Sequence, residues 1–143
     1  MKIILLLLFF FSFVNNYHVH AIETYVVLKI NNKIITNSDI NKESRYLVAL
    51  SPELESLDKK DLMKLAKDSI TREIIKENEL DKFFDLSIRN KLMDRIVSNY
   101  YKRMGMKSRD DFENYLIKKN LKYEEVEYKF TIEAAWNDLI FKK

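Results

Sequence analysis

The clearest hydrophobic pattern in the chain lies between Asp58 and Leu80. Apolar side chains recur there at intervals of three and four residues, at Leu62, Leu65, Ala66, Ile70, Ile74 and Ile75. This spacing places them on one stripe of a helix, and no proline or glycine interrupts the segment. The Asp58 side chain can cap the first turn. The pattern therefore predicts a long helix that buries one side, at the centre of a small helical domain.

The residues before this helix predict a β-hairpin followed by a shorter helix. Residues 24–36 hold two β-branched runs on either side of Asn31 and Asn32, a pair that tolerates a tight hairpin turn. A two-stranded hairpin is only marginally stable by itself, so we expect it to pack on the helices. The next helix is expected to begin with Thr36 or Ser38 as its N-cap, and to end near residue 50 because Pro52 follows.

Three further helices are predicted after the central one. They cover residues 87–103, a short stretch that begins at Ser108, and residues 122–141. Gly105 and Asn120 stand where a helix can end in the left-handed conformation. The last helix is apolar on two sides, so we expect it to lie between partners. The predicted fold is therefore all-α, with five helices and a small N-terminal β-hairpin.

Residues 1–21 have the pattern of a signal peptide. Lys2 precedes an apolar run from Ile3 to Val14, and small residues stand near Ala21, where a signal peptidase would cleave. The run is shorter than the roughly 20 residues that a membrane-spanning helix needs. We therefore expect contact with the membrane only during export, and one domain at residues 22–143. An uncleaved membrane anchor, in a small assembly factor, is the alternative.

The composition after residue 21 narrows the chemistry that the chain can perform. The sequence contains no cysteine, and His18 and His20 are its two histidines. The exported chain would therefore lack the groups for Ser-His-Asp and Cys-His catalysis and for the usual zinc sites. An exported protein without disulfides fits the periplasm. We expect no cofactor, since one glycine permits no glycine-rich phosphate loop.

The charge pattern gives no sign of a nucleic-acid partner. Loss of Lys2 with the signal peptide lowers the formal charge from +3 to +2. Basic and acidic residues are mixed along every segment, whereas a nucleic-acid binder usually carries a clustered basic face.

Several local sequences resemble, in the same order, the N-terminal domain of the SurA family of periplasmic chaperones. The most specific is the stretch from Asn31 to Ile40, NNKIITNSDI, and ITREIIKE at residues 70–77 resembles the family's central helix. The last two helices match in order and spacing at Gly105, Met106, Lys107, Ser108, Phe112, Tyr115, Leu116, Asn120, Leu121, Tyr123 and Val126. The resemblance extends from Thr24 to Ile140.

This resemblance implies a holdase that binds unfolded outer-membrane protein precursors and assists their folding and assembly. Aromatic and methionine side chains suit promiscuous binding of apolar segments. The candidate peptide-binding residues are Tyr46, Phe83, Phe84, Tyr100, Tyr101, Met104, Met106 and Trp136. The alternative for each of them is ordinary packing in the core. No catalytic, cofactor-binding or metal-binding residue is assigned.

Longer members of this family differ in a way that bears on activity. They carry parvulin-type peptidyl-prolyl cis-trans isomerase modules, which are rich in glycine and use active-site histidines. With one glycine and no histidine after His20, residues 22–143 hold no such module. The alternative function is therefore an N-terminal fragment of an isomerase whose catalytic modules lie beyond residue 143.

The same comparison bears on oligomeric state. In the longer members a C-terminal segment completes the hairpin. We therefore expect an exposed strand edge here, and a monomer or a weak dimer.

Overall fold

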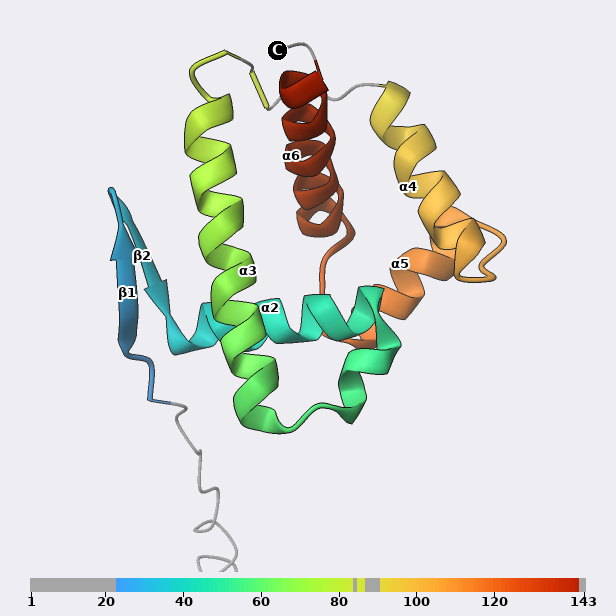
Figure 1. Cartoon of the computed structure of the whole chain (residues 1–143). Helices are drawn as coiled ribbons and strands as arrows, with labels where there is room; N and C mark the ends of the chain where they lie inside the picture. Colours follow the sequence, from blue (N-terminus) through green and yellow to red (C-terminus); the bar gives the residue numbers. More distant parts are fainter. Residues whose placement is uncertain (1–22, 84, 87–90, 142–143) are drawn as a thin grey trace, which may run out of the picture.

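The computed structural model describes residues 23–83, 85–86 and 91–141 (Figure 1). Over these residues the chain forms a two-stranded sheet, five α-helices and one 3-10 helix. In chain order they are β1 (Val26–Ile30), β2 (Lys33–Thr36), α2 (Asn37–Leu50), η1 (Pro52–Ser56), α3 (Lys59–Leu80), α4 (Lys91–Arg103), α5 (Arg109–Lys118) and α6 (Tyr123–Phe141). The predicted helical fold with a small N-terminal hairpin is confirmed. The predicted signal peptide, residues 1–21, lies outside the described residues.

Helix α3 is the long central helix that the hydrophobic pattern predicts. Asp58 is its N-cap, and the Asp58 carboxylate accepts a hydrogen bond of 2.8 Å from the backbone N–H of Asp61. The apolar stripe is narrower than the sequence indicates, because Ile74 is 6% exposed whereas Ile75 is 54% exposed. Adjacent residues on a helix point about 100° apart, so the buried face accommodates only one of the two.

Helix α2 lies across one end of α3 (Figure 1) and is held at its start by a capping box. The Thr36 hydroxyl accepts from the backbone N–H of Asp39 at 3.2 Å, and the Asp39 carboxylate accepts from the backbone N–H of Thr36 at 2.8 Å. Of the two predicted N-caps, Thr36 is therefore the one used. The helix ends at Leu50 before Pro52, as predicted, and the segment that follows forms η1.

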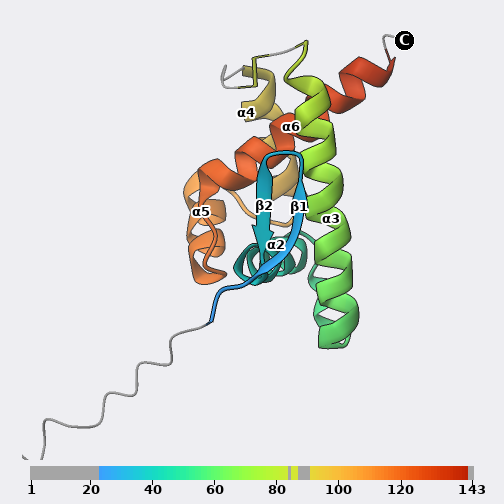
Figure 2. The same cartoon turned by 90° about the vertical axis from the view of Figure 1, so that its left-hand side faces the viewer.

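The hairpin stands beside α3, as Figure 2 shows from a second direction. Its tight turn places Asn31 at φ 52°, the left-handed conformation that asparagine tolerates. Along β2 the side chains alternate, with Ile35 2% exposed and facing the helices while Ile34 is 58% exposed. In the described part of the chain the sheet contains β1 and β2 alone, so each strand has an unpaired edge. Dimerisation through such an edge stays a prediction.

Two clusters of buried side chains form the core. The first surrounds Phe112 and consists of Ala49, Val97, Phe112, Leu116, Leu121, Tyr123 and Val126. The second joins the hairpin to α2 and α3 and consists of Ile35, Ile40, Ala66 and Ile74. All of these residues lie between positions 35 and 126, so residues 22–143 carry both clusters without the first 21 residues.

In the C-terminal part of the fold, the helices begin and end at the predicted capping residues. Ser108 and Asp111 form a capping box at the start of α5, and Asn120 after its end has φ 56°. Helix α6 packs between α3 and α4, which confirms the prediction that it is sandwiched (Figure 1). Helix α4 begins at Lys91, and the predicted earlier start at Ser87 lies outside the described residues.

Candidate functional site

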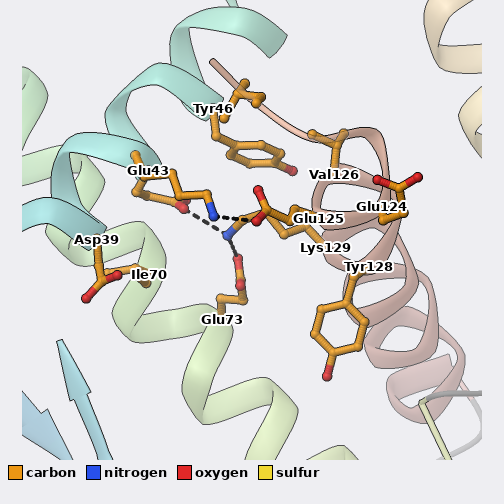
Figure 3. A pocket seen from close by; sticks show the side chains of 12 residues that line it. Asp39, Glu43, Tyr46, Ile70, Glu73, Glu124, Glu125, Val126, Tyr128 and Lys129 are labelled. Atoms are coloured by element: carbon orange, nitrogen blue, oxygen red, sulfur yellow. Dashed lines mark hydrogen bonds and ion pairs between the residues drawn. The ribbon is translucent and has the colours of Figure 1, made fainter. Parts of the chain in front are cut away.

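A pocket with mainly apolar walls lies where α2, α3 and α6 meet (Figure 3). Its volume is about 380 Å³, and apolar atoms supply most of its accessible lining. Helix α2 contributes Asp39, Lys42, Glu43 and Tyr46, and α3 contributes Ile70 and Glu73. The remaining wall is formed by Leu121, Glu124, Glu125, Val126, Tyr128 and Lys129. We call this the α2–α3–α6 pocket.

A largely buried ion cluster forms the floor of the pocket. The Lys129 ammonium donates to the Glu43 carboxylate at 2.8 Å and also to the carboxylate of Glu73. Glu43 is 2% exposed, and its other oxygen accepts a 2.8 Å hydrogen bond from the Ser69 hydroxyl. Burial raises the pKa of Glu73 above its usual value, although the nearby Lys129 opposes the shift. The cluster joins all three helices and carries one more carboxylate than ammonium.

Each charged side chain reaches this cluster because it stands on the inner face of its helix. Glu43 lies three residues after Ile40, and Glu73 lies three residues after Ile70, so each shares a face with an apolar neighbour. Lys129 stands likewise three residues after the buried Val126. The desolvation cost of burying these charges is offset by direct pairing and by the hydrogen bond from Ser69.

Two tyrosines supply neutral aromatic walls. The Tyr46 ring lies 4.8 Å from the Lys129 ammonium, measured to the ring centroid, which is a cation–π contact. Burial, with help from the nearby Glu43 and Glu73, raises the pKa of Tyr46 well above its usual value. The Tyr128 hydroxyl donates to Glu77 at 2.8 Å, and burial together with this bond raises the pKa of Tyr128. Both phenols are therefore protonated at neutral pH.

The structure brings some of the candidate peptide-binding residues together around the core and spreads the others over the molecule. Of the candidates within the described residues, Tyr46 alone lines the α2–α3–α6 pocket. Four others pack as partly buried side chains against the cluster around Phe112: Tyr100, Tyr101, Met104 and Met106. Phe83 follows the end of α3 and is 60% exposed, and Trp136 is half-buried on α6. Phe84 lies outside the described residues.

Sequence reasoning missed most of the pocket, including Glu43, Glu73, Tyr128 and Lys129. A signal was present at Glu43 and Ser44, which interrupt the apolar series that runs from Ile40 to Leu47 and are both buried. A carboxylate on the inner face of a helix needs a cationic partner from another element.

Metal binding, membrane spanning and similarity to known proteins each bear on the function of the chain. Among the described residues, no three histidine, cysteine or acidic side chains are grouped as metal ligands would be. None of the helices in the described ranges combines the length and the apolar character needed to cross a membrane. The chain matches no family model, and no match was found among curated proteins or among solved structures.

Proposed function

We propose that this chain is a periplasmic chaperone domain of the SurA N-terminal type, a holdase that binds unfolded outer-membrane protein precursors. The observation that carries the proposal is the α2–α3–α6 pocket, an open concave site with mainly apolar walls. Ligand sites in proteins usually combine apolar walls with a few fixed polar groups. The pocket has this character, since Ile70, Leu121 and Val126 lie beside the paired Lys129 and Glu73.

The shape of the site favours a segment of polypeptide over a small reactive substrate. Both tyrosine hydroxyls are protonated, and the Lys129 ammonium is paired with Glu43 and Glu73, so the polar groups of the floor are engaged with one another and the apolar walls remain for contact with a ligand. Apolar side chains of an unfolded chain could pack there with little demand for a particular sequence.

Two further features agree with the proposal. The N-terminal residues carry an export pattern, which would bring the domain into the compartment through which outer-membrane proteins pass. The order of elements, a hairpin followed by five helices, is the order expected from the resemblance to the SurA N-terminal domain.

The proposal predicts that residues 22–143 delay aggregation of a porin diluted from urea, at stoichiometric ratios. Tyr128→Ser removes an aromatic wall that is 37% exposed and belongs to neither core cluster. If that wall acts as an anchor, its loss should weaken client binding by about 1 kcal/mol or more, which is about fivefold. Light scattering after dilution measures the delay as a function of chaperone concentration.

The matched control is Ile117→Ser, which removes an apolar side chain that is 59% exposed on α5, outside the pocket. It should leave the delay unchanged. Absence of any delay by the unmutated chain, even in large molar excess, would exclude the holdase function for this domain.

A further inference from the structure

We propose that the α2–α3–α6 pocket selects bound segments that place a lysine or arginine next to apolar residues. This inference rests on the proposed function and adds a substrate preference to it. The preference comes from the charge of the pocket, from an unpartnered carboxylate oxygen, and from the apolar walls that surround both.

The charge of the pocket is strongly negative for a site with apolar walls. Five carboxylates line it, Asp39, Glu43, Glu73, Glu124 and Glu125, against the two ammonium groups of Lys42 and Lys129. The formal charge of the lining is therefore −3. A positively charged group on a ligand would be attracted to this surface, and an acidic one would be repelled.

Both ammonium groups are already engaged. Lys129 contacts Glu43 and Glu73, and Lys42 contacts Oε1 of Glu125 at 2.6 Å. The second oxygen of that carboxylate, Oε2, is buried and has no hydrogen-bond partner in the described part of the chain, although the Glu125 side chain as a whole is 36% exposed. A buried carboxylate oxygen without a donor is costly, and a cationic donor from a ligand would satisfy it without displacing Lys42.

The walls suit the rest of a basic side chain. Lysine and arginine carry an apolar stem below a charged head. Leu121 and Val126 offer apolar contact to such a stem, on the same wall as Glu125. The pocket already holds one ammonium in this manner, because Lys129 lies over the Tyr46 ring while it pairs with carboxylates. A ligand cation beside Glu125 would repeat that arrangement.

The experiment compares capped peptides that differ at one position. The first has a central arginine between leucine and phenylalanine, and the second has citrulline in its place, which keeps the shape but removes the charge. Affinity for residues 22–143 is measured by fluorescence anisotropy of a label on the peptide. We expect the arginine peptide to bind about tenfold more tightly, as a charge-assisted hydrogen bond implies.

Two variants locate the preference. In Glu125→Gln the tenfold difference should shrink, because the carboxylate proposed to pair with the ligand cation is lost while the other four carboxylates of the lining remain. In Glu55→Gln, the same substitution at a side chain of η1 that is 71% exposed, the difference should persist. Melting curves of both variants confirm that they remain folded.

Equal binding of the arginine and citrulline peptides would overturn the inference while leaving peptide binding, and so the proposed function, intact. Failure of both peptides to bind would also overturn it, and failure in the porin aggregation assay as well would remove the proposed function. Arginine amide or spermidine binding as tightly as the arginine peptide would show a site for free cations, which contradicts selection of polypeptide segments.

Discussion

Phe112→Ala is expected to lower the free energy of unfolding by about 3–5 kcal/mol, the usual cost of truncating a fully buried phenylalanine. Phe112 is 0% exposed and lies at the centre of the first core cluster. Its ring centroid lies 5.8 to 6.5 Å from the rings of four tyrosines, Tyr100, Tyr101, Tyr115 and Tyr123. Alanine would lose the contacts with all four of these rings.

Urea unfolding followed by circular dichroism measures this effect. Ile117→Ala, five residues later on the same helix and 59% exposed, is the control and should change stability by about 0.5 kcal/mol or less. A loss of under about 1 kcal/mol for Phe112→Ala would contradict the core described above. Domain stability of typical size, about 5–15 kcal/mol, makes the expected loss easy to detect.

Lys129→Met is expected to cost about 3–5 kcal/mol near neutral pH, because it leaves two carboxylates without their cation. Glu43 and Glu73 side chains are 2% and 20% exposed, so water cannot replace the ammonium fully. The control is Lys76→Met on the same helix interface. Its partner Glu133 has a side chain that is 51% exposed, and exposed pairs contribute about 0–1 kcal/mol.

The loss in Lys129→Met should shrink as the pH falls. The pKa of Glu73 is already raised by burial in the folded protein, and removal of Lys129 takes away a contact that lowers it. A raised folded pKa favours the protonated form, so the folded variant gains protons more readily than the unfolded chain and is relatively stabilised toward acid. Comparison of unfolding near pH 7 and near pH 4.5 measures the change. An equal loss of unfolding free energy at both pH values would contradict the stabilising role of the ion cluster.

Much of the fold could be predicted because its determinants are local. Three- and four-residue spacing of apolar side chains gave the positions of the helices. Thr36, Asp58 and Ser108 cap helices through hydrogen bonds that reach only three residues along the chain. Gly105 and Asn120 adopt positive φ where helices end. Each of these interactions is complete within a few residues of sequence.

The pocket could not be predicted because its parts are far apart in the sequence. Glu43 and Lys129 are separated by 86 positions, and Glu73 and Lys129 by 56. Their contact depends on how α2, α3 and α6 cross, which helical periodicity does not determine. Aromatic content pointed instead to residues such as Tyr100 and Tyr101, which the fold uses as packing around Phe112.

The claim that the α2–α3–α6 pocket binds unfolded polypeptide is tested most directly by nuclear magnetic resonance. An isotope-labelled sample of residues 22–143 is titrated with a synthetic peptide that corresponds to one membrane-spanning strand of a porin. We expect amide shifts to change around the pocket, at Tyr46, Val126 and Lys129, while α5 near Ile117 stays constant. Shifts that gather on α5, or a spectrum that the peptide leaves unchanged, would contradict the claim.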